Sequence, residues 1–419
     1  SMELRRVVIT GLGTINPLGN SVEEYFTNLN NGVSGAGPIT RFDASLFKTR
    51  FACEVKDFNP AAFGIDRKEA RKMDKFSQYA NAAADQAVAD AKLLDCESID
   101  KKRVGVIVGS GIGGIETLSE EIMGYCEGGK IPRFNPFLIP KMIPDIIAGQ
   151  ISIKYGFMGP NYATVSACAS SAHAMSNAFD MIRLNKADII VTGGSEAGVT
   201  IASVGGFNSA QALSTNNDEA QTASRPFDKR RDGFVIGEGS GILIFEEYEH
   251  AKARGAKIYA EVLGTGMSAD AHHITAPHPE GEGAIEAMRL ALKEAGLKPE
   301  DVDYINVHGT STPLGDIAEL KAVKEVFGEH AYKLNISSTK SMTGHLLGGA
   351  GAIETMACID AICNGIIPPT INFVEEDPEI DYKLNLTLNK AQKREVNVAL
   401  NNTFGFGGHN SCLVLGKVR

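Results

Sequence analysis

The fold of this chain can be approached from one stretch of sequence, Thr164-Val-Ser-Ala-Cys168-Ala-Ser-Ser-Ala-His173. The apolar residues at 162–165 predict a short buried strand, and residues 172–182 have apolar positions at helical spacing. Cys168 is therefore expected at a corner between strand and helix, where free backbone N–H groups and the positive end of the helix dipole meet. Such a corner favours the thiolate, the nucleophilic form of cysteine. The alternative is a small buried thiol without chemistry, which is the commoner state of a cysteine.

The same order of strand, corner and helix occurs a second time. Around Lys340 and His345, a strand, a polar corner and a Gly- and Ala-rich helix repeat the pattern around Cys168. Three pairs of strands match in order along the chain: 7–13 with 258–266, 103–109 with 302–309, and 162–165 with 336–338. The repeat predicts an α/β protein of two mixed five-stranded halves, with helices packed between and outside them.

We place the first half at residues 3–255 and the second at 256–419. Ser1 and Met2 are left out, because a serine before the first methionine is typical of a residue from an expression tag. In α/β sheets, ligands bind at the carboxyl ends of strands. Cys168, His308 and the loop at 340–345 all follow predicted strands, so we expect them to meet in one cleft if the halves are related by a twofold axis.

Composition and charge narrow the classes of function. The net charge of −10 over 419 residues argues against nucleic acid or an anionic membrane as a partner. The seven cysteines show no metal-ligand spacing, so the sequence indicates no zinc site and no disulfide framework, and we expect no cofactor. Gly11-x-Gly13 lacks the third glycine of a dinucleotide loop, because Asn16 stands there. No run approaches the roughly 18 apolar residues of a membrane span, and we expect a cytoplasmic protein.

Four ordered motifs resemble those of the β-ketoacyl-[acyl-carrier-protein] synthases of the thiolase superfamily, and most closely the elongating branch named synthase II. The motifs are Val165-Ser-Ala-Cys-Ala-Ser-Ser171, Val307-His-Gly-Thr-Ser-Thr-Pro-Leu-Gly-Asp316, Ser338-Thr-Lys-Ser-Met-Thr-Gly-His345 and Asn402-Thr-Phe-Gly-Phe-Gly-Gly408. The resemblance extends from about residue 5 to the last residues. It implies a thiolase-like, five-layered αβαβα fold made by internal duplication, in agreement with the repeat found in the residues alone.

The activity implied by the resemblance is the condensing step of type II fatty acid elongation. Acyl-[acyl-carrier protein] and malonyl-[acyl-carrier protein] react by decarboxylative Claisen condensation and give 3-oxoacyl-[acyl-carrier protein]. By the same resemblance, Cys168 would be the nucleophile that carries the acyl group, and His308 and His345 would complete a Cys-His-His site. An acyl-cysteine holds one substrate while the other enters. Neutral imidazole N–H groups can stabilise the enolate that forms when the malonyl group loses CO₂.

Further residues take roles from their match to the family motifs. Lys340 would support the histidines, and because it follows a buried strand it needs a carboxylate partner, for which Glu354 in the next helix is the candidate. Phe406 would gate the entrance to the acyl pocket, and its backbone N–H would form the oxyanion hole with that of Cys168. The glycines beside Phe406 would allow this close approach of the backbone. The positions that match substrate contacts are Ile112, Phe207, Thr310, Thr312 and Phe404.

The partner implied by the resemblance is an acyl carrier protein. Lys68, Arg71 and Lys72 cluster at a predicted helix start and form a candidate docking patch for an acidic partner. Relatives often place an arginine facing the carrier where this chain has Gln211, so docking would depend more on this patch. Each exposed ion pair contributes about 0–1 kcal/mol, so the loss of one need not abolish recognition. The resemblance also suggests a homodimer, in which residues 137–138 would reach the partner's pocket.

Other interpretations of the same motifs fit less well, and a polyketide condensing enzyme is the closest rival. A polyketide condensing enzyme would have this fold and chemistry with a different partner. A non-catalytic chain-length factor would share the fold and lack the nucleophile, whereas Cys168 is present here. Biosynthetic thiolases use a second cysteine, and Cys412 lacks the matching C-x-G motif. Chalcone-type synthases have an asparagine where His345 stands.

Overall fold

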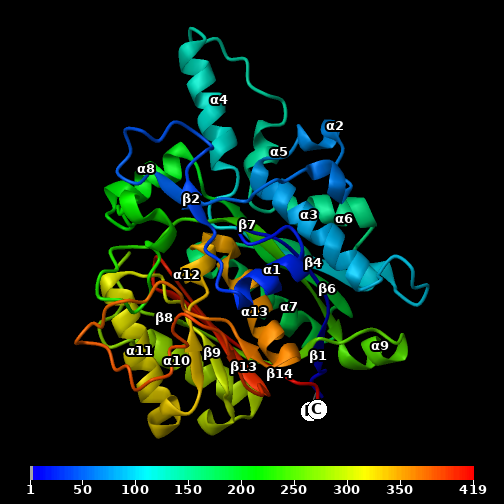
Figure 1. Ribbon diagram of the computed structural model, residues 1–419. Helices are drawn as coiled ribbons and strands as arrows, with labels where there is room; N and C mark the ends of the chain where they lie inside the picture. The colour runs from blue at the N-terminus through cyan, green and yellow to red at the C-terminus, as the bar shows by residue number, and fades with distance from the viewer. Residues whose placement is uncertain (1–2) are drawn as a thin grey trace.

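The computed structural model describes residues 3–419, so the interpretation of Ser1 and Met2 lies outside the described residues. A ten-stranded mixed sheet runs through the molecule in the order β10-β9-β13-β14-β8-β1-β7-β6-β4-β5 (Figure 1). The first half of the chain supplies β1 (Val7–Ile15), β4 (Val104–Gly109), β5 (Asn161–Thr164), β6 (Ile189–Ala197) and β7 (Glu238–Glu247). The second supplies β8 (Ala260–Ala269), β9 (Tyr304–Asn306), β10 (Asn335–Ser337), β13 (Val398–Gly405) and β14 (His409–Gly416). Two small antiparallel sheets are separate from the ten-stranded sheet, one of β2 (Ala36–Pro38) with β3 (Phe51–Cys53) and one of β11 (Ile366–Ile367) with β12 (Gln392–Lys393).

The two groups of five strands have the same order, β5-β4-β6-β7-β1 and β10-β9-β13-β14-β8. In each group the first three strands are parallel to one another, and each later neighbouring pair is antiparallel. The groups join where residues 7–9 of β1 pair antiparallel with β8. This order confirms the duplicated mixed α/β fold predicted from the sequence. The boundary between residues 255 and 256 stays a prediction.

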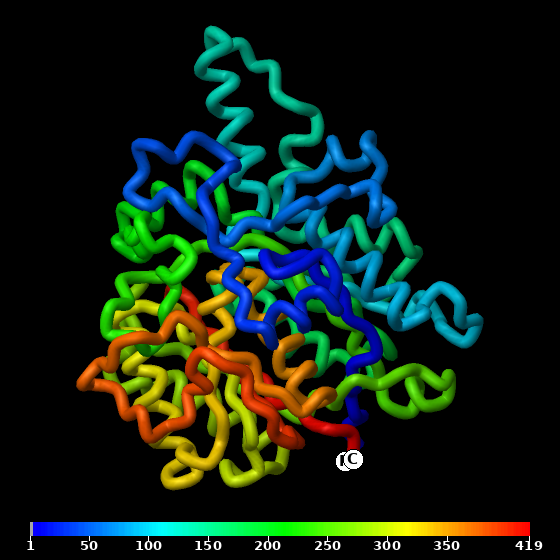
Figure 2. Tube along the Cα trace, in the orientation of Figure 1, coloured from blue at the N-terminus to red at the C-terminus, as the bar shows by residue number. Residues whose placement is uncertain are grey.

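Helices cover both faces of each group of strands and produce five layers (Figures 1 and 2). α3 (Lys75–Asp90) and α6 (Ile146–Tyr155) cover the outer face of the first group, and α10 (Glu282–Ala295) and α11 (Pro313–Phe327) that of the second. α7 (Ser170–Arg183) and α13 (Ala350–Asn364) pack against each other between the groups. The other helices are α1 (Val22–Asn30), α2 (Arg67–Ala70), α4 (Ile115–Glu127), α5 (Leu138–Met142), α8 (Ile201–Ser209), α9 (Tyr248–Ala253) and α12 (Lys340–Thr343).

Three large hydrophobic cores hold the layers together. In the central core, Met175 of α7 and Ile353 of α13 pack with strand residues from both halves. Two outer cores lie under the helices that cover each half. Gly11 and Gly13 of β1 face α3, where a Cβ atom on either glycine would collide with carbonyl oxygens of the helix. These glycines therefore allow the Ala-rich helix to approach the sheet closely, and they form no nucleotide loop.

The strand before Cys168 differs from the prediction. β5 lies at the end of the sheet and pairs only with β4 among the described strands, so Asn161 is exposed and Val165, just after the strand, is 61% exposed. Within a single chain the prediction of a buried strand at 162–165 is wrong, because an apolar run does not show whether its strand has a neighbour on both sides. An edge strand leaves backbone N–H and C=O groups free to pair with another chain.

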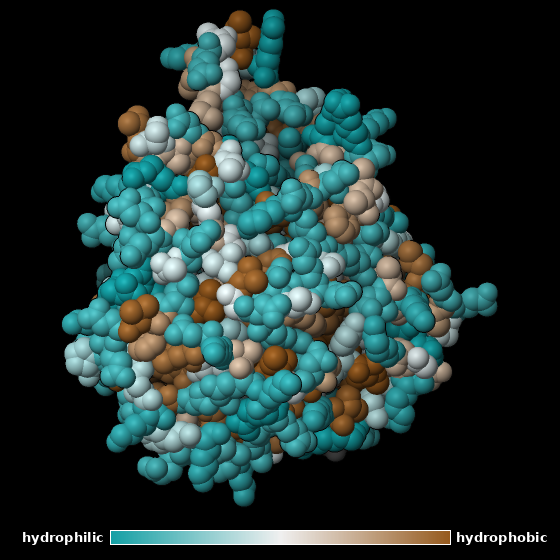
Figure 3. All heavy atoms as spheres, in the orientation of Figure 1, coloured by the Kyte–Doolittle hydropathy of each residue, from teal (hydrophilic) through white to brown (hydrophobic). Residues whose placement is uncertain are grey.

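An arm made of α4, α5 and their connection projects from the body of the molecule (Figure 1). Large apolar side chains on this arm are exposed, namely Leu118, Ile122, Met123, Ile131, Phe134, Phe137 and Ile139. Figure 3 shows a face that is otherwise mostly hydrophilic, with apolar side chains in scattered groups. Within residues 3–419, no helix is both long enough and apolar enough to cross a membrane.

Candidate active site

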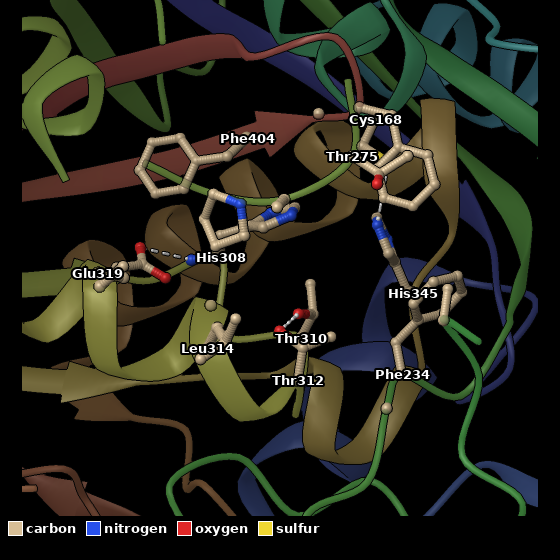
Figure 4. A pocket seen from close by; sticks show the side chains of 18 of the residues that line it. Cys168, Phe234, Thr275, His308, Thr310, Thr312, Leu314, Glu319, His345 and Phe404 are labelled. Atoms are coloured by element: carbon tan, nitrogen blue, oxygen red, sulfur yellow. Dashed lines mark hydrogen bonds between the residues drawn. The ribbon is translucent and has the colours of Figure 1, made fainter. Parts of the chain in front are cut away.

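Cys168 lies in the sharp turn η3 (Ala167–Ala169), between the end of β5 and the start of α7. Ala167 has a φ of +52°, in the left-handed region that most residues avoid, so the chain turns abruptly just before the cysteine. Cys168 is 9% exposed and lines a cavity of about 650 Å³ (Figure 4). The predicted corner between strand and helix is therefore present, and its sulfur lies in the wall of a cavity.

His345 reaches the sulfur from the second half of the chain. It follows α12, and its Nε2 lies 3.1 Å from Sγ of Cys168. Its other ring nitrogen, Nδ1, accepts the backbone N–H of Leu347 at 3.2 Å. Because Nδ1 accepts, neutral His345 carries its proton on Nε2 and donates it toward the sulfur.

His308 follows β9 and is held by a buried ion pair. Nζ of Lys340 lies 3.3 Å from Nδ1 of His308 and 2.7 Å from Oε1 of Glu354 in α13. The side chains of Lys340 and Glu354 are each 1% exposed, so the predicted pairing of the two is confirmed. An ammonium group can only donate hydrogen bonds, so Nδ1 of His308 accepts and its Nε2 carries the ring proton.

Both histidines are neutral near pH 7. Burial lowers the pKa of His308 and of His345 well below the ordinary value, and the charge of Lys340 lowers both further. The two rings line the same cavity, with centroids 5.2 Å apart and planes at 88° (Figure 4). The neutral state expected from the sequence is thus found, and its cause is burial beside a cation.

The thiol of Cys168 differs from the prediction. Burial raises its pKa to about 12, and the charge of Lys340 and the backbone N–H groups of Phe406 and Cys168 lower it only in part. The predicted preference of this corner for the thiolate is therefore wrong for the free protein, because loss of solvent outweighs the helix end. Cys168 is a thiol at neutral pH.

The turn between β13 and β14 covers the sulfur. A Cβ atom on Gly405 would lie 3.1 Å from the backbone nitrogen of Cys168, so a side chain there would push the turn or the corner aside by a few tenths of an ångström. Gly407 and Gly408 have φ values of +93° and +78°, which place the turn in a conformation that favours glycine. The backbone N–H of Phe406 bonds toward Cys168, and its ring lies 5.9 Å from that of Phe207. The turn therefore brings an N–H donor and an aromatic ring close to the sulfur of Cys168.

Four of the five positions predicted to contact substrate line the same cavity as Cys168, namely Phe207, Thr310, Thr312 and Phe404. The hydroxyl oxygens of the two threonines lie 3.0 Å apart, and the ring of Phe404 lies 5.6 Å from that of His308. The fifth position, Ile112, lies outside the cavity lining. It is 37% exposed in the turn after β4, and its backbone N–H donates to Glu196.

The residues predicted to dock a carrier protein lie on the surface beside α2. Lys68 and Arg71 are exposed, and Lys72 is half-buried with its ammonium 5.4 Å from the ring centre of Phe137. None of the three lysine and arginine side chains lines the cavity, whereas Gln211 does. No group of His, Cys, Asp or Glu side chains within the described residues has the arrangement to hold a metal ion.

Glu319 holds the turn that carries His308, and the sequence analysis did not identify it. From α11 its carboxylate accepts the backbone N–H groups of His308 and Gly309, both at 2.8 Å. Burial raises the pKa of Glu319 to about 7, while these N–H groups and the charge of Lys340 lower it. No side-chain pattern in the sequence indicates this role, because Glu319 acts on backbone N–H groups of the preceding turn.

Comparisons with known proteins agree with this arrangement. Residues 4–251 match the Beta-ketoacyl synthase, N-terminal domain family, and residues 259–374 match the Beta-ketoacyl synthase, C-terminal domain family. The chain is 51% identical over 417 residues to a Synechocystis sp. protein named 3-oxoacyl-[acyl-carrier-protein] synthase 2, an alignment that covers 100% of this chain and 99% of that relative.

Solved structures with similar folds include two ketosynthases. A beta-ketoacyl synthase from Burkholderia phymatum has a TM-score of 0.91 and 36% identity, covering 99% of this chain and all of that one. A ketosynthase bound to the hexaketide, in complex with its type II PKS acyl-carrier protein, has a TM-score of 0.89 and 36% identity over the same shares of the two chains.

Proposed function

The chain belongs to the β-ketoacyl synthase family, and we propose that Cys168, His308 and His345 carry out the condensation of this family in the cavity that they share. The activity is that of a 3-oxoacyl-[acyl-carrier-protein] synthase in fatty acid elongation. An acyl group and a malonyl group, each on acyl carrier protein, yield the 3-oxoacyl product and CO₂. One observation carries the assignment of residues: a buried thiol and two neutral imidazoles with their protons on Nε2 line one cavity.

Acyl transfer begins when Sγ of Cys168 attacks the thioester carbonyl of the acyl carrier. Because the pKa of the thiol is raised, its proton is lost as the new C–S bond forms, and the carrier C–S bond breaks with transfer of that proton to the departing carrier sulfur, which leaves as a thiol. The developing oxyanion accepts hydrogen bonds from the backbone N–H groups of Cys168 and Phe406, which already point toward the sulfur. Collapse of the tetrahedral intermediate leaves an acyl-cysteine.

Condensation uses the two imidazole N–H groups. The thioester oxygen of the malonyl group accepts hydrogen bonds from Nε2 of His308 and of His345, so that the electrons released with CO₂ are stabilised as an enolate. The enolate carbon then attacks the acyl carbonyl, and Cys168 leaves as a thiolate that accepts the N–H of His345, 3.1 Å away. Removing one such donor from a comparable oxyanion hole raises the barrier by about 2.7–4 kcal/mol.

The Lys340–Glu354 pair makes this donor arrangement possible. The ammonium donates to Nδ1 of His308, which leaves the proton of that ring on Nε2. Its charge also keeps both imidazoles neutral, because it lowers their pKa values. Glu354 compensates the buried cation at 2.7 Å. The lysine therefore acts by fixing the tautomer of His308 and by keeping both histidines neutral.

Acyl carrier protein is the proposed partner, and its docking patch is the basic group made of the exposed Lys68 and Arg71 and the half-buried Lys72. A polyketide condensing enzyme is the second candidate, since a ketosynthase of that class has the same fold. The identity of 51% to the 3-oxoacyl synthase, against 36% to the polyketide ketosynthase, favours fatty acid elongation. All seven cysteines are free, which supports a reducing, cytoplasmic location.

We propose a homodimer formed at the β5 edge. The edge has a free row of backbone groups, Val165 beside it is 61% exposed, and the neighbouring arm exposes seven large apolar side chains. Val165→Asp is expected to yield monomers in light scattering, whereas Leu46→Asp, at a position 98% exposed elsewhere, leaves the dimer intact. A monomeric parent protein, or a dimeric Val165→Asp variant, would contradict this assignment.

Separate measurement of the two steps tests the assignment of the histidines. His308→Ala and His345→Ala are expected to accept an acyl group on Cys168 and to lose condensation by about 10²-fold or more. His330→Ala is the control, because that ring bonds to a carbonyl of residue 302, outside the cavity. Condensation at the parent rate in either catalytic variant would contradict the proposed roles.

A further inference from the structure

The duplicated fold contains a second corner of the same shape as the one that carries Cys168. In the first half, Ala167 has a φ of +52° and is followed by Cys168, a short 3-10 turn and α7. In the second half, Leu347 has a φ of +53° and is followed by Gly348, the turn η7 (Leu347–Gly349) and α13. Gly348 is therefore the counterpart of Cys168.

Strand register identifies the counterpart of His308. Val106 in β4 and Tyr304 in β9 are equivalent, because each pairs with the first residue of the neighbouring edge strand. Four residues further along the chain stand Ser110 and His308, each just past its strand. The second corner thus has a serine where the first has a catalytic histidine.

The same register identifies a glutamate at the second corner. Val106 also pairs with Val191 in β6, and Tyr304 pairs with Ala399 in β13. Five residues beyond these partners stand Glu196 and Phe404. Glu196 therefore occupies the place at the second corner that Phe404 occupies beside the catalytic histidine.

Glu196 fills the second corner completely. It is 1% exposed and accepts four hydrogen bonds of 2.9–3.1 Å, from the Ser110 hydroxyl and from the backbone N–H groups of Gly111, Ile112 and Gly348. The N–H of Gly348 is the counterpart of the Cys168 N–H that we assign to the oxyanion hole. The carboxylate thus takes the site where the first corner receives a substrate oxygen.

The four hydrogen bonds join the two halves of the active site. Gly348 lies three residues after His345, and Gly111 packs on the corner of the nucleophile, where a Cβ atom on it would be 3.3 Å from the carbonyl oxygen of Ala167. We propose that Glu196 is a positioning residue for the condensation, which holds the segment of His345 against the corner of Cys168 and so fixes their 3.1 Å contact. The claim that Glu196 serves the condensation rests on the proposed function. Its effect on the position of Cys168 and His345 can be measured even if that function is wrong.

The charge of Glu196 disfavours the thiolate of Cys168. The effect of this charge can therefore be measured separately from the effect of Glu196 on the position of the two segments. Among the groups around the sulfur, Lys340 lowers the pKa of Cys168 and Glu196 raises it. In Glu196→Gln, an amide oxygen can still accept the N–H groups of Gly111 and Gly348, because both bond to the same carboxylate oxygen in the parent. The other oxygen accepts the Ile112 N–H and the Ser110 hydroxyl, and the NH₂ that replaces it can only donate, so the Ile112 bond is lost. The amide variant therefore keeps the bridge between Gly111 and Gly348 and removes the charge.

The test compares Glu196→Gln, Glu196→Ala and Gly348→Ala with the parent. Glu196→Ala is expected to lower kcat for condensation by about 10²-fold with an unchanged KM for the acyl carrier, because a misplacement of about 1 Å has that effect. Glu196→Gln is expected to keep most of kcat and to alkylate faster with iodoacetamide at Cys168, followed by peptide mass spectrometry. Gly348→Ala is expected to resemble Glu196→Ala, because its Cβ atom would lie 2.6 Å from the nitrogen of Gly111.

Glu246→Ala is the matched control, since Glu246 is a fully buried glutamate of the sheet that bonds to Thr10, His250 and Arg254. It should lose stability and keep kcat. The positioning role would be overturned if Glu196→Ala and Gly348→Ala condensed with the parent kcat. It would also be overturned if the control Glu246→Ala lost as much of kcat as these two variants. If the parent protein itself does not condense the substrates, the proposed function fails, and the alkylation of Cys168 still reports whether Glu196 acts on the nucleophile.

Discussion

Replacing Lys340 with methionine leaves a buried carboxylate without its cation. In the parent, Oε1 of Glu354 bonds to Lys340 at 2.7 Å, and Oε2 has no hydrogen-bond partner among the described residues. Breaking a buried ion pair costs about 3–5 kcal/mol, because the remaining charge is neither solvated nor paired. The double variant Lys340→Met/Glu354→Met removes both charges and is expected to recover most of that free energy of unfolding.

The loss of stability in Lys340→Met should depend on pH. Burial raises the pKa of Glu354 to about 6 beside the lysine, and the pKa rises further when the cation that lowers it is removed. A carboxyl group with a folded-state pKa above its unfolded value stabilises the fold below the unfolded pKa, and this contribution is lost as the pH rises through the folded value. The deficit of Lys340→Met relative to the parent is therefore larger at about pH 8 than at about pH 5.

Urea unfolding followed by circular dichroism at both pH values measures these differences. Condensation should stay lost in the single and the double variant, because His308 loses the donor on Nδ1 in both. Three results would refute this reasoning: a Lys340→Met variant as stable as the parent at about pH 8, a deficit that shrinks as the pH rises, or a double variant that condenses at the parent rate.

Three further predictions follow from the site. Between about pH 8 and 6 the rate of condensation by the parent should show no titration of an imidazole, since burial and Lys340 keep His308 and His345 neutral there. A midpoint near the ordinary histidine pKa would contradict this. In Gly405→Ala the new Cβ atom would lie 3.1 Å from the nitrogen of Cys168, and acylation measured by intact mass should slow by about 10²–10³-fold. The control Gly124→Ala, where no atom lies within 4 Å, should acylate at the parent rate. Arg71→Glu/Lys72→Glu should weaken acyl-carrier binding most at low salt; equal affinity at all ionic strengths would exclude the patch.

The sequence predicted the candidate site best where a residue's role shows in a motif of residues next to it in the chain. Cys168 and His308 each follow a strand and His345 follows the short helix α12, each within a distinctive motif, and the repeat of strands along the chain matches the observed sheet order. The apolar run at 162–165 predicted a strand correctly and its burial incorrectly, because burial depends on whether another strand lies beside it. Ile112 matched a substrate position by motif, yet the turn after β4 places it outside the cavity.

Properties that depend on distant segments could not be predicted. The raised pKa of Cys168 arises from burial under the β13–β14 turn and neighbouring segments, which come together only in the folded chain. Glu196 is a single charge at the end of an apolar strand, and its role depends on donors from two loops, of which Gly348 lies 152 residues away. Glu319 likewise acts on backbone groups of the preceding turn, which no side-chain pattern reveals.

The central claim is that Cys168 carries the acyl group between the two steps. Intact-mass spectrometry after incubation with acyl-carrier protein should show one acyl adduct, which peptide analysis places on Cys168. Addition of malonyl-carrier protein should discharge this adduct as the 3-oxoacyl product forms, and Cys168→Ala should show neither adduct nor product. Product formation by Cys168→Ala, or a productive adduct on another of the seven cysteines, would contradict the account.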